Sequence, residues 1–288
     1  MGQPILEKGT GKTLRPILVG AGVPGLTGWG QVVSSFAGAV NLRHPQGLLV
    51  SLVEDPRNMT SLSVCVPALF RKQERRLFPG KRVRLEGPSL AAEDFVLDLQ
   101  GRPIWQGRIT GEDVKGLSPS KILLLKQSLV SMGQDGGFLG LLRREQTDNA
   151  FVSKARRVLA GGQVLCGLVG LGPGSTPSGD DFVAGVLMRE EAKAVAAHRE
   201  PVIPWSAEKE GLRAAMDRTN DAGKTLLWQA LHGRFPSYLI EAVRSVSEAK
   251  GRQEIDEAVE RAVSHGATSG TDALVGFVFY REGAFEEP

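Results

Sequence analysis

The pattern of hydrophobic and polar positions changes once along the chain, near residue 115. Before that point, short apolar runs of strand length alternate with turn residues. Apolar and polar side chains also alternate from Val83 to Leu85 and from Phe95 to Leu99. This period of two is typical of strands that cover a core with one face. The predicted strands are 48–53, 61–67, 81–86, 95–99 and 103–109, with Gln100 and Gly101 as a hairpin turn between the last two. We expect a small barrel or sandwich.

After residue 115, apolar residues recur at spacings of three and four, which predicts helices. Ser118 as N-cap and Pro119 at the first helical position begin the first helix, and Gly133 ends it. The glycine-rich stretch 134–140 is predicted to be a mobile loop. Further helices are predicted at 151–159, 181–197, 207–216, 225–231, 236–249 and 255–263. The chain is therefore predicted to be an α+β protein, with a β-rich domain over residues 1–115 and a helical domain over residues 116–288.

Composition narrows the class of protein. Two cysteines in 288 residues, with no Cys-x-x-Cys pair, exclude a disulfide scaffold and a cysteine-based metal centre. The 35 basic and 32 acidic residues leave a net charge of only +3. The basic stretch 71–84 contains few aromatic residues on which nucleic-acid bases could stack, so we interpret it as a solvated face rather than a nucleic-acid site. No run of about 18 apolar residues occurs, and the N-terminus is polar. We expect a soluble, cytoplasmic protein with no membrane partner.

An internal repeat is the most informative feature of the sequence. Residues 178–187 align without gaps to residues 269–278, and both copies read Ser-Gly-x-Asp, three apolar residues, Gly and two apolar residues. Each copy is predicted to be a turn that runs into a buried helix. A capping box alone would explain the serine and the aspartate three residues later. It would not explain a glycine in the first turn of a helix, which costs about 1 kcal/mol relative to alanine.

Two roles for these glycines stay open in the sequence, because a missing Cβ lets either a ligand or another backbone come close. The later glycines, Gly185 and Gly276, would let the two helices pack tightly, so that both N-termini meet at one site. The segment 170–177 before the first copy contains three glycines and two prolines, and it could present backbone N–H groups to an oxyanion. The candidate substrate-binding residues are Gly172, Gly174, Thr176, Ser178, Gly179, Thr268, Ser269 and Gly270.

The acidic residues at the predicted site allow three kinds of chemistry. A Mg²⁺ ion could bridge the carboxylates of Asp180 and Asp181, the acids could accept N–H groups of an amide or carbamoyl substrate, or one acid could serve as general base. His265, four residues before the second copy, suits either acid–base work or a helix-end contact. The candidate catalytic residues are Asp180, Asp181, Asp272 and His265.

The segment 170–182, which reads Gly-Leu-Gly-Pro-Gly-Ser-Thr-Pro-Ser-Gly-Asp-Asp-Phe, resembles the signature of the AllH-type family. That family is associated with one subunit of oxamate carbamoyltransferase in anaerobic allantoin breakdown. The resemblance implies an enzyme that interconverts oxalurate plus phosphate with oxamate plus carbamoyl phosphate, assembled with other subunits. This sequence departs from the family pattern at Ser175, where leucine is usual, and at Ala267, where histidine is frequent. His265 could substitute for that histidine.

The functional hypothesis is therefore a carbamoyltransferase subunit that acts on a small molecule with carbamoyl and carboxylate or phosphate groups. Two alternatives remain at this point. One is a noncatalytic assembly or ligand-binding subunit whose partners carry the chemistry. The other is a metal-dependent enzyme acting on another small amide or phosphate ester, because shared ancestry does not determine the reaction.

Overall fold

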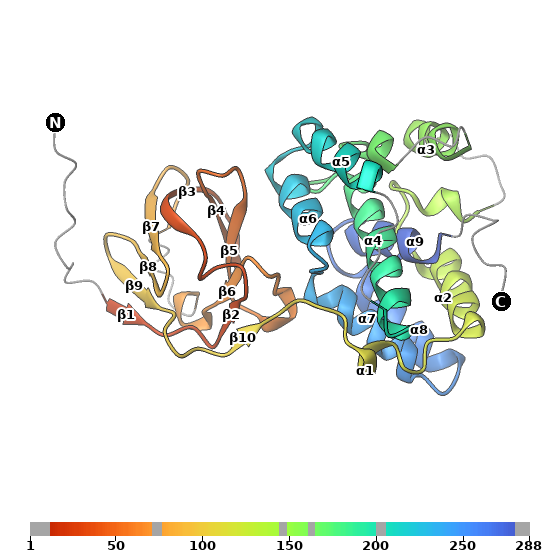
Figure 1. The fold of residues 1–288 in the computed structure, drawn as a ribbon, viewed down its shortest axis with the longest axis horizontal. Coiled ribbons are helices and arrows are strands. Elements are labelled where there is room, and N and C mark those ends of the chain that lie inside the picture. Colours follow the sequence, from red (N-terminus) through yellow and green to blue (C-terminus); the bar gives the residue numbers. More distant parts are fainter. Residues whose placement is uncertain (1–11, 71–76, 144–148, 161–164, 200–205, 280–288) are drawn as a thin grey trace. The chain divides into compact units, whose positions relative to one another are not determined.

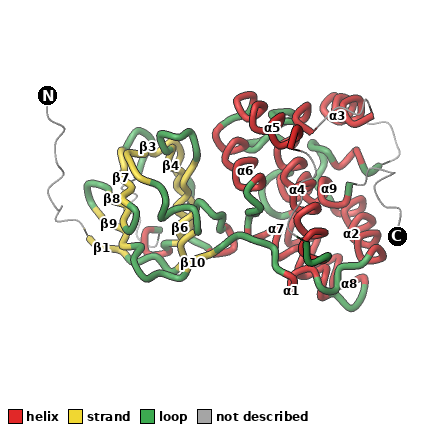
Figure 2. Tube along the Cα trace, in the orientation of Figure 1, coloured by secondary structure: helices red, strands yellow, loops and turns green. Residues whose placement is uncertain are grey.

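The computed structural model describes residues 12–70, 77–143, 149–160, 165–199 and 206–279, with the side chains of residues 206 and 207 left out. The chain forms two compact units that divide between Gly107 and Arg108. Strands occur in the first unit and the nine labelled α-helices in the second (Figures 1 and 2). The α+β class and the order of the β-rich and helical parts are as predicted. Among the described residues, no helix has both the length and the apolar character needed to cross a membrane.

The described strands of the first unit form one ten-stranded sheet, curved as a half-barrel rather than split into a sandwich. Its order is β1-β9-β8-β7-β3-β4-β5-β6-β2-β10. The pairs β1–β9, β5–β6 and β2–β10 are parallel and the other pairs are antiparallel. The strands are β1 (Lys12–Leu14), β2 (Leu18–Gly20), β3 (Thr27–Ser35), β4 (Ala39–Arg43), β5 (Leu49–Val53), β6 (Ser63–Cys65), β7 (Arg82–Glu86), β8 (Ser89–Ala91), β9 (Phe95–Asp98) and β10 (Ile104–Trp105).

Alternation along these strands builds the core, as the sequence pattern predicted. Val83 and Leu85 of β7 and Phe95 and Leu97 of β9 are buried, while their neighbours are partly or fully exposed. The predicted hairpin at Gln100 is wrong, because β9 pairs with β1 and β8, and β10 pairs with β2. A parallel partner from far along the chain leaves no local signal in the sequence.

Helices make up the second unit. They are α1 (Gly111–Val114), α2 (Pro119–Met132), α3 (Ala150–Ala160), α4 (Ser178–Ala196), α5 (Ser206–Ala215), α6 (Asp221–Leu231), α7 (Ser237–Glu248), α8 (Arg252–Val263) and α9 (Ser269–Val278). The start of α2 confirms the predicted cap, since the Ser118 hydroxyl accepts the Lys121 N–H and Pro119 takes the first helical position. The helix α9 packs against α2, α7 and α8 as well as α4, so it lies at the centre of the unit.

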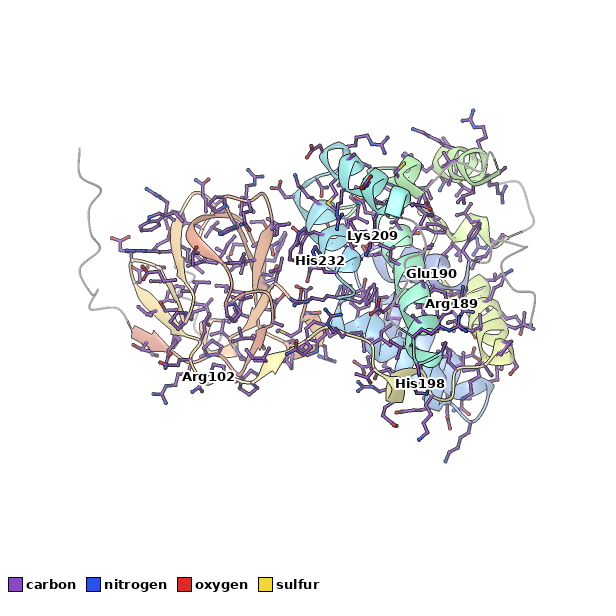
Figure 3. All side chains as sticks on the ribbon, in the orientation of Figure 1. Arg102, Arg189, Glu190, His198, Lys209 and His232 are labelled. Atoms are coloured by element: carbon purple, nitrogen blue, oxygen red, sulfur yellow. The ribbon has the colours of Figure 1, made fainter. Side chains whose placement is uncertain are left out.

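The contact between α4 and α9 brings the two backbones together at two glycines. A Cβ placed on Gly185 would lie 1.9 Å from the Ala273 carbonyl oxygen, and one placed on Gly276 would lie 2.0 Å from the Phe182 carbonyl oxygen. Real Cβ atoms do not approach an oxygen so closely, so neither position admits a side chain without displacement of a helix. Arg189 of α4 also reaches across, with its guanidinium carbon 5.4 Å from the centroid of the Phe277 ring of α9 (Figure 3).

Substituting Gly185 with alanine is expected to destabilise the protein by about 1–3 kcal/mol, because the new methyl group overpacks a backbone contact. Urea unfolding would measure the change in the free energy of unfolding. Gly111→Ala is the matched control, since nothing lies within 4 Å of its Cβ position. That control should stay within about 0.5 kcal/mol of the native chain. A Gly185→Ala protein as stable as the control would show that the two helices do not depend on this contact.

Candidate functional site

The two repeat copies contact each other reciprocally at their N-terminal ends. The Thr176 hydroxyl, just before α4, lies 3.0 Å from the Ser269 hydroxyl at the start of α9, and both hydroxyls face Asp181 of α4. Ser178 of α4 in turn faces Asp272 of α9. The glycine contacts are reciprocal in the same way, because Gly185 contacts Ala273 and Gly276 contacts Phe182. Gly185 is equivalent to Gly276 in the repeat, and Phe182 is equivalent to Ala273. The copies are therefore related by a local pseudo-two-fold arrangement.

Helix capping does not explain these serines and aspartates. The residues before the helices, Pro177 and Thr268, are the N-caps of α4 and α9, and neither makes a side-chain capping bond. Ser178 and Ser269 lie one position later, inside the first turn. The capping-box alternative is therefore wrong for both copies.

Three buried polar atoms at this junction have no hydrogen-bond partner among the described residues. They are Ser178 Oγ, Asp181 Oδ2 and Asp272 Oδ2. Asp181 and Asp272 are 2% and 0% exposed. Ser178 lies near enough to Asp272 to lower its pKa, but not in hydrogen-bond geometry. Buried carboxylate oxygens without partners are rare in proteins and destabilising, which makes this junction the candidate functional site.

The electrostatics couple the two acids. Burial raises the pKa of Asp181 well above its usual range, and the nearby charge of Asp272 raises it further. Burial also raises the pKa of Asp272 to about 6, against the opposing effect of the Phe138 N–H, which donates to its Oδ1 at 2.6 Å. Two carboxyl groups in one desolvated space cannot both ionise easily. Near neutral pH, these directions favour a pair in which Asp181 carries a proton and Asp272 is ionised.

Asp180 is oriented differently from the other two acids. Its Oδ1 accepts the Gly170 N–H at 2.8 Å, and its Oδ2 accepts the Thr219 hydroxyl. Both oxygens are thus engaged within the protein. The carboxylate ties the glycine-rich segment to the residues that precede α6. The pairing of Asp180 with Asp181 as Mg²⁺ ligands finds no support in this geometry, and the described residues contain no group of three or more His, Cys, Asp or Glu side chains arranged to hold a metal.

The repeat glycines in the first turns face protein backbone. A Cβ on Gly179 would lie 2.0 Å from the Leu168 carbonyl oxygen, and one on Gly270 would lie 1.9 Å from the Ala262 carbonyl oxygen. Of the two roles left open by the sequence, the structure therefore supports close backbone approach. Gly179 and Gly270 offer no room for a ligand on that side.

The glycine-rich segment uses its own carbonyls to satisfy the start of α4. The Gly179 N–H donates to the Leu171 carbonyl oxygen at 2.7 Å, and the Ser178 N–H donates to the Pro173 carbonyl oxygen at 3.2 Å. Within the described residues, no hydrogen bond engages the N–H groups of Gly172, Gly174 or Thr176. Gly172 and Gly174 have φ of +104° and +110°, a conformation that only glycine adopts easily. The backbone donors that remain for a ligand are therefore in the loop, not in the helix terminus.

Two contributors to the site were missed by sequence analysis. The stretch predicted to be a mobile loop is held to α9, because the Gln134 N–H donates to Thr271 Oγ1 at 2.9 Å and the Phe138 N–H donates to Asp272. A Cβ on Gly137 would lie 2.3 Å from both Asp272 oxygens. No periodicity marks such a loop as part of a site, although its cluster of glycines was a signal of close approach.

Tyr238 of α7 is the second missed residue. Burial raises its pKa well above the usual range, and the charges of Asp181 and Asp272 raise it further, so the phenol lies near both acids. Its ring stacks on that of His265, with centroids 3.8 Å apart and planes 15° apart. Burial lowers the pKa of His265, which favours the neutral imidazole. The predicted candidate His265 is thus next to the site, with Tyr238 in contact with its ring.

The raised pKa of Asp272 has a consequence for stability. In the unfolded chain this group has a pKa near 3.8, so the folded state binds more protons between that value and about 6. The contribution of Asp272 to the free energy of unfolding is greatest below pH 4. This contribution falls by about 3 kcal/mol as the pH rises through 6. Asp272→Asn keeps the oxygen that accepts the Phe138 N–H but cannot ionise. Relative to the native chain, this variant should gain stability between pH 4 and 8. Urea unfolding at several pH values would measure the difference, and a constant difference would contradict the buried acid.

Part of the helical unit is similar to a known protein family. The family model described as oxamate carbamoyltransferase subunit AllH matches residues 168–281, a range that begins just before the glycine-rich segment and includes both repeat copies. No curated protein and no solved structure shows significant similarity to the chain. The resemblance indicated by segment 170–182 is confirmed. Over residues 168–281, the chain is similar to the AllH family.

Proposed function

We propose that the chain is a subunit of an oxamate carbamoyltransferase and that the carbamoyl group is transferred at the junction of α4 and α9. The observation that carries the proposal is the pair of buried acids, Asp181 and Asp272, each with one oxygen that has no partner among the described residues. The family description names a subunit of this enzyme, and the matched range contains the pair.

The reaction needs one proton donor and one proton acceptor. In the direction that forms carbamoyl phosphate, an oxygen of hydrogen phosphate bonds to the carbamoyl carbon of oxalurate, and the bond from that carbon to the oxamate nitrogen breaks. The nitrogen keeps the electron pair and must gain a proton, while the phosphate oxygen must lose one. An ionised Asp272 suits the acceptor, and a protonated Asp181 suits the donor. The pair ends with the same number of protons as it had at the start.

Charge on the carbamoyl oxygen also has to be stabilised as phosphate adds. The N–H groups of Gly172, Gly174 and Thr176 are donors without partners among the described residues, so they suit this role. The phenol of Tyr238 on α7 lies near the acids and suits the role of a further donor. Asp180 acts as a positioning residue in this proposal, because it holds the Gly170 N–H and thereby the loop that carries these amides.

The burial of these acids from solvent is compatible with a site that is completed by other subunits. The unpartnered oxygens of Asp181 and Asp272 are inaccessible to solvent, whereas Thr176, Thr268 and Ser269 around them are partly exposed. A substrate therefore needs a small displacement at this rim, which another subunit could stabilise. The same observation favours the second candidate, a noncatalytic assembly subunit, if the rim never opens.

Replacing Asp181 with Asn in the assembled enzyme tests the catalytic proposal. Turnover should fall about 10²- to 10⁴-fold, the usual contribution of a general acid or base, while the chain remains folded. The measurement is carbamoyl phosphate formation from oxalurate and phosphate. Asp217→Asn is the matched control, since its side chain is 85% exposed and pairs only with Lys224 among the described residues. The control should keep native turnover.

A second readout distinguishes catalysis from assembly. If carbamoyl phosphate binds at the junction, a concentration of about 100 times its dissociation constant should raise the unfolding midpoint of the native chain by about 5 °C. The shift should shrink in Asp181→Asn and persist in Asp217→Asn. Native turnover in Asp181→Asn, with the complex intact, would support the assembly role and exclude Asp181 as the proton donor.

A further inference from the structure

A second candidate site lies in the β-rich unit, outside the range that matches the family model. An open cavity of about 370 Å³ occurs on the face of the sheet formed by β3, β4 and β7. This volume is within the range of small-molecule sites. Its lining contains two arginines, an indole and no carboxylate; the lining residues are Trp29, Gly30, Gln31, Arg43, His44, Pro45, Gly47 and Arg82.

Strand register brings the basic residues together. Gln31 of β3 is paired with Arg43 of β4 on one side and with Arg82 of β7 on the other, and Trp29 is paired with Arg84. Neighbouring strands are about 4.8 Å apart, so these side chains share one small area of the sheet. Val32 and Val83, the next residues along β3 and β7, are buried and occupy the opposite face. The basic cluster is thus on the solvent side.

Arg82 is positioned by an aromatic ring rather than by an acid. Its guanidinium carbon lies 4.5 Å from the Trp29 ring centroid, and that of Arg84 lies 5.9 Å away. Arg84 pairs with Glu86, but no ion pair holds Arg82 within the described residues. A guanidinium that contacts an indole through its face keeps the N–H donors at its edge available. Those donors suit the paired oxygens of a phosphate or carboxylate.

The lining residue His44 is held by hydrogen bonds at both of its ring nitrogens. His44 is 3% exposed, and its Nδ1 accepts the Gln46 N–H at 3.3 Å. Its Nε2 therefore carries the proton and donates to the Thr27 carbonyl oxygen at 3.0 Å. Residues 44–47 form a turn, which is closed by the Gly47 N–H donating to the His44 carbonyl oxygen at 2.8 Å. His44 thus fixes the turn that borders the arginines.

We propose that this cavity binds a small organic phosphate, with the phosphate on Arg82 and the organic part against Trp29 and Pro45. The absence of acids from the lining leaves the positive charge of Arg82 uncompensated there, which favours an anion. The cavity is larger than inorganic phosphate alone requires, and its indole and proline supply apolar surface for a carbon skeleton. Its size favours a small molecule over a nucleic acid or an acidic peptide. The ligand does not take part in carbamoyl transfer.

The test measures binding of ribose 5-phosphate to the full chain by titration calorimetry. Arg82→Gln should weaken binding at least tenfold, and Arg82→Lys should weaken it less, because lysine keeps the charge but lacks the planar fork. Arg57→Gln is the matched control, as it removes one charge from an arginine whose side chain is 80% exposed outside the cavity lining. It should bind within twofold of the native chain. Trp29→Phe should abolish the tryptophan fluorescence change that accompanies binding.

Controls on the ligand separate the phosphate from the organic part. Ribose should not bind, and inorganic phosphate and malonate should bind at least tenfold more weakly than ribose 5-phosphate. Equal affinity for these anions would overturn a site for an organic phosphate. Equal binding by Arg82→Gln and the native chain, or no binding below about 10 mM, would overturn it as well. So would Arg82-dependent binding of an oligonucleotide or acidic peptide without binding of ribose 5-phosphate. Asp181→Asn should not change this binding, which keeps the result independent of the carbamoyltransferase proposal.

Discussion

The backbone contact between α4 and α9 is the constraint on which the rest of the helical unit depends. Gly185 and Gly276 let each helix approach the carbonyl oxygens of the other, at distances that no side chain permits. Because the two copies of the motif use equivalent residues, each copy places its aspartate opposite the serine of the other. The site is thus a product of helix packing, and two residues that are 91 positions apart in the chain become neighbours.

Bringing two carboxyl groups together out of water is unfavourable, and the structure compensates for only part of it. The Phe138 N–H supports Asp272, and the Thr176 and Ser269 hydroxyls support Asp181. One oxygen of each acid remains without a partner within the described residues. Because this unfavourable arrangement lies at the buried contact between α4 and α9, Asp181 and Asp272 have raised pKa values. In the proposed function, this pair supplies an acid and a base near neutral pH.

The two proposed sites differ in the donors that they offer to an anion. In the helical unit, N–H groups of the glycine-rich loop have no partner among the described residues, while carbonyls of the same loop accept the N–H groups at the start of α4. In the β-rich unit, sheet register collects arginines on one face and an indole holds one of them in place. In the proposals above, the first arrangement stabilises a reacting group that gains charge, whereas the second binds a charged ligand.

The sequence alone determined the local features of this protein. The spacing of apolar residues predicted the α+β class and most of the helices. Ser118 and Pro119 predicted the start of α2, and the repeat indicated that two helix N-termini contribute to the site. The sequence therefore indicated Ser178, Asp181, Ser269 and Asp272 as candidate site residues. These features depend on neighbouring residues, for which a single sequence carries a direct signal.

Only the tertiary structure decided which candidates share a space. It separated Asp180, whose two oxygens are engaged by Gly170 and Thr219, from Asp181, although the two are adjacent in sequence. It brought in Tyr238 and the loop at Phe138, and it paired β10 with β2 instead of β9. Each of these outcomes depends on contacts between residues far apart in the chain. Such contacts are set by packing and burial of the whole unit, and no local pattern of polar and apolar residues encodes them.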